Sequence, residues 1–199
     1  MNKIPPRLVL ASRSPRRKDL LKDAGYEFLV LPAESDQEEG PRDGESAAEL
    51  VERLAEQKAL AVAAHLEKAV VVGCDTVVEC EGSILGKPPN VTAAKRMLLQ
   101  LRGREHRVYS GLCLVEMPGA GKWQGVAETS LVMDSINDEQ LARYLQSGGW
   151  AGKAGAFGYQ DGLEWLRIVK GSASNVVGLP LELFSSLLTD AGYVPFDHR

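Results

Sequence analysis

The sequence predicts an α/β fold, because short apolar segments rich in β-branched residues alternate with helical segments along the chain. Of its 199 residues, 44% are hydrophobic and 25% are charged, which is typical of a globular protein. A chain of this length buries a core without disulfide or metal staples. No internal repeat, linker or low-complexity tract divides it, so we expect one large domain, or two tightly joined lobes, over residues 1–199.

Local signals place the elements of the N-terminal half. Ser14 and Pro15 begin a helix, since serine caps helices and proline suits the first helical position, and Gly25 ends it. Ser46 and Glu49 have the spacing of a capping box and open a long helix that extends to about residue 66. The expected strands of this half cover residues 7–11, 28–32, 69–73 and 76–80.

The C-terminal half continues the alternation. Thr92 caps a helix that ends before Gly103, and Asn137 with Gln140 brackets the start of a helix that ends near residue 148. The expected strands here cover residues 108–117, 125–134 and 163–169, and the last helix covers residues 180–188. A glycine-rich loop, AGKAGAFGYQDG, precedes the last strand.

Charge and cysteine content exclude several classes of protein. The net charge of −4 argues against a general binder of nucleic acid or of membrane surfaces. Cys74, Cys80 and Cys113 form no CxxC pair, so we expect core thiols in a reducing compartment. No apolar run approaches the ~18 residues that cross a bilayer, and the apolar part of the N-terminus is too short for a signal peptide. These features predict a cytoplasmic protein.

The segment ASRSPRRKDLL is suited to bind phosphate. The amides at a helix N-terminus carry a partial positive charge and bind phosphate oxygens. Arg16 and Arg17 fall in the first turn, where cations oppose the helix dipole, and a polyphosphate ligand would remove this conflict. Ser12 and Ser14 add hydroxyl groups. The alternative for this segment alone is a solvated basic turn.

This segment also resembles a known family. LASRSPRR is similar to the opening motif of Maf proteins, which are nucleoside triphosphate pyrophosphatases. RLAEQKA, VVGCDTVV, EGSILGKP, GKAGAFGYQ and SNVVGLPL resemble later Maf motifs, in the family's order and over nearly the whole chain. The resemblance implies a two-lobed, Maf/inosine-triphosphatase-like α/β fold around a mixed twisted sheet, with the substrate cleft between the lobes. Family members are often dimers, so the resemblance also admits a homodimer.

The resemblance assigns chemistry to further residues. Asp75 follows an apolar run, so we expect it at or near a strand end, where ligands of α/β proteins bind. By itself it reads equally as an exposed acid, but it matches the family's central aspartate, which implies a catalytic and metal-binding role with Thr76 as a helper. Lys58 and Lys87 read as solvated lysines by themselves. Their family matches imply that they act with Arg16 on the triphosphate.

The loop at residues 152–162 is expected to bind the base. Glycines let backbone approach a ligand closely, and the amide of Gln160 both donates and accepts, as the pairing edges of thymine and uracil require. The loop resembles that of the Maf subfamily that prefers dTTP and UTP, which also implies that Lys153 binds substrate. One methyl group separates the two bases, so dTTP and UTP stay open as alternatives.

The acidic loop departs from the family. Gln37 stands where Maf proteins carry a metal-binding glutamate, and an amide is a weaker Mg²⁺ ligand than a carboxylate. We therefore expect Asp36, or else Glu38, to join Asp75 in holding Mg²⁺ (or Mn²⁺). Asp161 also replaces what is often glycine, which leaves the geometry beside Gln160 open.

Together these features predict hydrolysis of dTTP and UTP, with modified pyrimidine nucleotides as further candidate substrates, to the monophosphate and pyrophosphate by attack of water on the α-phosphorus. Two alternatives remain at this point. One keeps the chemistry but acts on a methylated purine triphosphate such as 7-methyl-GTP. The other is a non-catalytic nucleotide-binding regulator, which the change at Gln37 favours and the presence of Asp75, Lys58 and Lys87 opposes.

Overall fold

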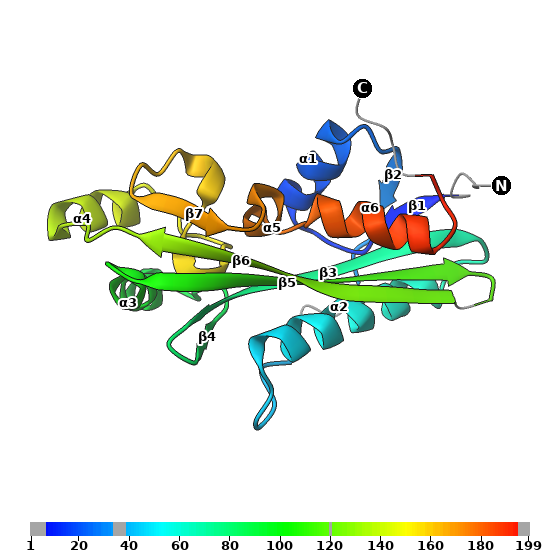
Figure 1. Cartoon of the computed structure of the whole chain (residues 1–199), viewed down its shortest axis with the longest axis horizontal. Helices are drawn as coiled ribbons and strands as arrows, with labels where there is room; N and C mark the ends of the chain where they lie inside the picture. The colour runs from blue at the N-terminus through cyan, green and yellow to red at the C-terminus, as the bar shows by residue number, and fades with distance from the viewer. Residues whose placement is uncertain (1–6, 34–38, 120, 195–199) are drawn as a thin grey trace. The chain divides into compact units, whose positions relative to one another are not determined.

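A computed structural model describes residues 7–33, 39–119 and 121–194, and it confirms the α/β prediction (Figure 1). The described strands form a seven-stranded sheet in the order β2-β1-β3-β5-β6-β7, with β4 paired to β3. The strands are β1 (Leu8–Leu10), β2 (Phe28–Val30), β3 (Ala69–Cys80), β4 (Ser83–Leu85), β5 (Glu105–Met117), β6 (Gly121–Met133) and β7 (Leu166–Lys170). The helices are α1 (Pro15–Asp23), α2 (Ala47–Ala63), α3 (Val91–Leu101), α4 (Asp138–Gln146), α5 (Ala173–Val177) and α6 (Leu181–Asp190), with 3₁₀ turns η1 (Ala154–Ala156) and η2 (Tyr159–Asp161).

The sheet is mixed. β1 pairs in parallel with β2 and with β3, so that Leu8 lies opposite both Phe28 and Val70. β4 pairs antiparallel with β3, and β7 pairs antiparallel with β6. Two compact units divide the chain: unit 1 holds residues 1–75, 110–127 and 178–199, and unit 2 holds residues 76–109 and 128–177. The chain passes between the units within β3, β5 and β6. Two lobes of one domain stay a prediction.

Unit 1 has a helix layer on each face of its part of the sheet. Successive strand residues point to opposite faces, and the buried residues follow that period of two. One set packs with α2 and includes Val9, Val71, Cys113 and Val115. The alternate set packs with α1 and α6 and includes Leu10, Val72, Leu112 and Leu114. Figure 1 shows α2 on one side of these strands and α1 and α6 on the other.

Helix α2 lies directly on the strands, because glycines face it. A Cβ atom added at Gly73 of β3 would collide with the carbonyl oxygen of Ala55 and lie 2.7 Å from the amide nitrogen of Ala59. A Cβ atom added at Gly111 of β5 would collide with the carbonyl oxygen of Val51. The backbones of helix and strand therefore touch at both positions, which carries the next residues of α2 close to β3.

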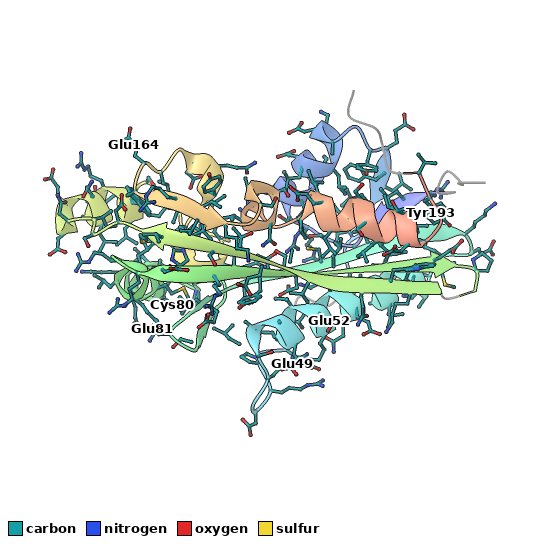
Figure 2. The ribbon with its side chains drawn as sticks, in the orientation of Figure 1. Glu49, Glu52, Cys80, Glu81, Glu164 and Tyr193 are labelled. Carbon is teal, nitrogen blue, oxygen red and sulfur yellow. The ribbon has the colours of Figure 1, made fainter. Side chains whose placement is uncertain are left out.

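The caps of α2 and α4 confirm the expected capping boxes. The Ser46 hydroxyl accepts from the Glu49 amide, and the Glu49 carboxylate accepts from the Ser46 amide. Asn137 and Gln140 make the same reciprocal pair at α4. Figure 2 shows Glu49 and Glu52 on α2. Glu52 accepts a 3.0 Å hydrogen bond from Gln124, which ties the helix to β6.

The start of α3 was predicted wrongly. Its N-cap is Asn90, whose side chain accepts a 2.9 Å hydrogen bond from the Ala93 amide, and Thr92 already lies inside the helix. Asparagine is at least as good a cap as threonine. Asn90 directly precedes the first helical residue, Val91, so the helix begins before Thr92. The short helix α5 was missed, because five residues give too little periodic signal.

Unit 2 has one core of its own. It joins β3, β5 and β6 to α3, α4 and the glycine-rich loop. Its buried members include Val78, Leu98, Leu131, Leu141 and Phe157. The loop is thus packed on the sheet through buried residues.

We predict that Gly73→Ala destabilises the protein by about 1–3 kcal/mol, the usual cost of overpacking, because the new methyl group must push α2 off β3. The measurement is the free energy of unfolding from urea titration followed by circular dichroism. Gly40→Ala is the control, since a Cβ atom there meets nothing within 4 Å, and it should leave stability unchanged. Equal stability of the two variants would contradict the close approach of α2.

Candidate active site

A buried ion pair joins α2 to β3. The ammonium nitrogen of Lys58 lies 2.5 Å from Oδ1 of Asp75, with side-chain exposures of 17% and 5%. The structure thus brings together two residues predicted to act on the triphosphate. The expectation that Asp75 stands at a strand end was wrong. β3 continues unbroken to Cys80 and pairs with β4 beyond Asp75, so Asp75 lies inside the strand.

The position of Lys58 follows from the packing of α2. Ala59, its neighbour, touches Gly73, which precedes Asp75 by two residues on β3. Residues 71, 73 and 75 face α2 because strand side chains alternate. The Lys58 stem therefore spans only the short distance from the helix to the strand. A carboxylate buried this deeply is expected to have a charged partner, and Lys58 is that partner.

A network of acids and an arginine, which links α2 to the segment before it, was missed by the sequence analysis. Arg53 binds the carboxylate of Glu45 through two hydrogen bonds of 2.6 and 2.8 Å and lies 3.2 Å from a carboxylate oxygen of Glu39. The hydrogen bonds from Arg53 hold the pKa of Glu45 at about 2, below its ordinary value. The bond to Glu45, with smaller contributions from the charges of Glu39 and Asp75, raises the pKa of Arg53. The only sequence signal was that Arg53 opens the motif RLAEQKA.

The N-terminus of α1 is built as expected, with one difference. Ser14 is the N-cap and Pro15 begins the helix. Arg17, however, is 9% exposed. It donates from Nε to the carbonyl oxygen of Gly178 at 2.7 Å and from Nη1 to the Ser12 hydroxyl at 3.1 Å. The basic residue that seemed to oppose the helix dipole therefore ties α1 to the segment after α5.

The same carbonyl links α1 to β3. The thiol of Cys74 donates to the Gly178 oxygen at 3.2 Å, and Cys74 precedes Asp75. Ser12 and Arg17 are thus joined through Gly178 to the neighbour of the buried carboxylate. Arg16 is half-buried and Arg13 is exposed in the same turn. The roles of Ser12, Ser14, Arg16 and Arg17 toward substrate stay predictions.

The cysteines are free and buried at all three positions, as core thiols should be. Burial raises the pKa of Cys113 to about 12 and also raises the pKa of Cys80. These shifts keep the two thiols protonated and unreactive at neutral pH.

Unit 2 contains two more of the residues predicted to act on the substrate, Thr76 and Lys87. Lys87 is exposed and follows β4, and Thr76 is half-buried on β3. The Gly155 amide donates to the Gly86 carbonyl oxygen at 3.1 Å, which ties the glycine-rich loop to the neighbour of Lys87. A Cβ atom on Gly155, whose φ is +66°, would lie 2.7 Å from Val78. This close approach explains a glycine here.

The glycine-rich loop presents Gln160 at its surface. Phe157 is buried, and its ring packs edge to face against the His106 imidazole. The ring centroids are 5.4 Å apart and the ring planes make an angle of 71°. Gln160 lies in η2 and is exposed. Lys153 forms an ion pair with Asp161 at 2.5 Å, so the side chain predicted to bind substrate has a partner within the loop.

The metal prediction falls largely outside the described part of the chain. Asp36, Gln37 and Glu38 belong to residues 34–38, which the structure does not describe. Among residues 7–33, 39–119 and 121–194, no three histidine, cysteine or carboxylate groups gather in a metal-binding cluster. Asp75 is the described residue that offers an oxygen ligand at the predicted site.

The mixed sheet with helices on both faces in unit 1 defines an α/β protein, and this protein contains a buried lysine–carboxylate pair. The Maf family, described as Maf-like protein, matches residues 7–191, and the chain belongs to this family. A dTTP/UTP pyrophosphatase of Rhodopirellula baltica is 48% identical over 92% of this chain and 82% of that protein. A dTTP/UTP pyrophosphatase of Pelotomaculum thermopropionicum is 43% identical over 94% of this chain and 97% of that protein.

A solved structure supports the expected fold. A HAM1 protein of Coxiella burnetii has a TM-score of 0.51 and 14% identity, over 92% of this chain and 98% of that chain. The likeness concerns the fold alone. Within the described residues, none of the helices combines the length and the apolar character that a membrane span requires. The cytoplasmic location stays a prediction.

We predict a pH-dependent loss of stability that depends on His106. The imidazole is 2% exposed, and burial lowers its pKa from 6.5 to about 4. The unfolded chain therefore takes up a proton near pH 6.5 and the folded chain only near pH 4. The free energy of unfolding should fall by about 3 kcal/mol across this window as the pH is lowered.

Urea titrations between pH 4 and pH 7 measure this dependence. His106→Gln should flatten the profile in that window, whereas His65→Gln, at an exposed position, should keep the wild-type slope. A wild-type slope in His106→Gln would show that the imidazole is not the group responsible.

Proposed function

We propose that this chain hydrolyses dTTP and UTP to the nucleoside monophosphate and pyrophosphate. The observation that carries the proposal is the buried Lys58–Asp75 pair, because it sets an ammonium group and a carboxylate from two motifs that resemble those of the family side by side. Relatives named dTTP/UTP pyrophosphatase support the choice of substrate. A pure binding protein has less need to bury a carboxylate at this cost.

The basic groups act on the triphosphate. Arg16 and the amides at the start of α1 bind phosphate oxygens, as helix N-termini do. Lys58 and Lys87 neutralise the charge that develops on the leaving pyrophosphate. Ser12, Ser14 and Thr76 donate hydrogen bonds from their hydroxyl groups. In this scheme Arg17 acts through Ser12, which it holds in place.

Asp75 serves the attacking water. Lys58 binds Oδ1 and so fixes the direction of the carboxylate. The carboxylate orients a water molecule and accepts its proton while the water oxygen bonds to the α-phosphorus. The bond from the α-phosphorus to the α–β bridging oxygen breaks, and pyrophosphate leaves with that oxygen. No covalent intermediate with the protein is formed.

The residues fit a divalent cation that arrives with the nucleotide. Mg²⁺ is usually held by one or two carboxylates together with substrate phosphates, and Asp75 offers one such carboxylate. We assign the second to Asp36, with Glu38 as the alternative. Bound Mg²⁺, or Mn²⁺ in its place, would offset the negative charge of the phosphates.

Gln160 selects the base. Its amide is exposed on a loop whose buried residues fix the backbone on the core of unit 2. One amide can donate to a carbonyl oxygen of thymine or uracil and accept from the ring N–H. We therefore assign a pyrimidine nucleotide as the partner of this protein, and we assign it neither a nucleic acid nor a membrane as a partner. A homodimer stays a prediction.

We predict that Asp75→Asn lowers pyrophosphate release from dTTP and UTP by at least about 100-fold, the smallest effect usual for a general base. Pyrophosphate and phosphate release are measured with Mg²⁺ on dTTP, UTP, CTP, purine triphosphates and 7-methyl-GTP. Asp23→Asn, at an exposed position of α1, should behave as wild type. Circular dichroism verifies that each variant folds.

The outcomes separate the alternatives. A folded Asp75→Asn protein with near-normal turnover would refute the role of Asp75. Faster turnover of 7-methyl-GTP would replace the pyrimidine by a methylated purine. A folded wild-type protein without turnover on any nucleotide would favour the non-catalytic regulator.

We predict that Gln160→Leu reduces the preference for dTTP and UTP over CTP by about tenfold, because the loss of hydrogen bonds to the base weakens binding. The measurement is kcat/KM for each nucleotide. Gln146→Leu changes an exposed glutamine of the same unit and should leave the ratio unchanged. An unchanged ratio in Gln160→Leu would remove this residue from base recognition.

A further inference from the structure

We propose that Lys153 and Asp161 form an ionic clasp that positions Gln160 for the base, rather than acting on the substrate directly. This inference rests on the proposed function. It concerns the place where the chain departs from its family, since Asp161 replaces what is often glycine. Both residues are therefore positioning residues for base selection.

The clasp joins the two 3₁₀ turns of the loop. Nζ of Lys153, just before η1, lies 2.5 Å from Oδ2 of Asp161, the last residue of η2. The side chains are 14% and 30% exposed. The hydroxyl of Tyr144, on α4, donates to the same oxygen at 3.4 Å. Asp161 is thus held to the start of the loop and to a helix.

Gly158 lies against the clasp. A Cβ atom added there would collide with Nζ of Lys153 and lie 2.5 Å from Oδ2 of Asp161. Gly158 has φ −124° and ψ 117°, a conformation open to any residue, so the backbone does not require glycine. A methyl group at position 158 would instead have to displace the ends of the Lys153 and Asp161 side chains.

Gln160 is held between fixed neighbours. The amide of Asp161 donates to the carbonyl oxygen of Gly158 at 3.1 Å and closes η2 around Tyr159 and Gln160. On the N-terminal side, Phe157 is buried against His106. With the clasp closed, the backbone of Gln160 has little freedom, and its exposed amide meets the base in one orientation. Preorganisation of this kind reduces the entropy lost on binding.

The clasp contributes to selectivity more than to stability. Ion pairs with partial exposure add little to folding, so variants that open it should still fold. Direct substrate binding needs the charge of Lys153 alone, whereas the clasp needs the charges of Lys153 and Asp161 in contact. Substrate binding by Lys153 and the clasp therefore make different predictions for mutants.

Three single variants of the full chain test the clasp: Lys153→Gln, Asp161→Asn and Gly158→Ala. The first two each remove a charge, whereas the third keeps both charges and separates them with a methyl group. Each should lower the preference for dTTP and UTP over CTP by about fivefold, within the range of a local coupling. The change should appear in KM, with kcat within about twofold of wild type.

The double variant Lys153→Gln/Asp161→Asn should be no worse than either single variant, because both open the same clasp. Asp138→Asn is the matched control. It breaks another ion pair of unit 2, between Arg102 and Asp138 at 2.7 Å, and should leave the preference unchanged. Hydrogen exchange at the Asp161 amide, which donates to the Gly158 carbonyl oxygen, should be faster in the three single variants than in the control.

Three results would overturn the clasp. A defect in Lys153→Gln with normal behaviour of Asp161→Asn and Gly158→Ala would show direct contact of Lys153 with substrate. Additive losses in the double variant would show that Lys153 and Asp161 act independently of each other. Unchanged exchange at Asp161 in all variants would show that the ion pair does not hold the loop. If the wild-type protein hydrolyses no nucleotide, the proposed function fails, and the exchange measurement still decides the clasp.

Discussion

The close contact of α2 with the glycine positions of β3 and β5 is the constraint on which the rest of the site depends. Gly73 and Gly111 let the helix lie closer than any side chain would allow. At that distance Lys58 reaches Asp75, and the carboxylate can be buried because a charged partner comes with it. The same helix carries Arg53, which holds Glu45. The close packing of α2 on β3 and β5 therefore places the Lys58–Asp75 ion pair of unit 1.

Several polar side chains in the family motifs form ion pairs or hydrogen bonds with other groups of the protein. Arg17 binds Ser12 and Gly178, Lys58 binds Asp75, and Lys153 binds Asp161. A residue shared with a family of enzymes is therefore not by itself a residue that touches substrate. Some of these side chains fix the geometry of others, and only their partners in the fold reveal which.

The sequence by itself determined most of the elements and the caps of α1, α2 and α4. Ser14, the Ser46–Glu49 box and the Asn137–Gln140 box were predicted correctly, because each depends on residues within one helical turn. The alternating apolar pattern predicted the sheet, and the ordered motifs predicted the family. Errors came where two local signals competed, as at Asn90 and Thr92 in α3.

The tertiary structure alone decided which side chains meet. Lys58 and Asp75 are 17 residues apart and Arg17 and Gly178 are 161 apart, so no local pattern could pair them. The position of Asp75 inside β3 likewise follows from the strand continuing beyond it to pair with β4. Propensity and capping act over a few residues, whereas an ion pair forms only after the chain has folded back on itself. The sequence therefore determined which chemical groups are present, and the packing of helix on strand decided their partners.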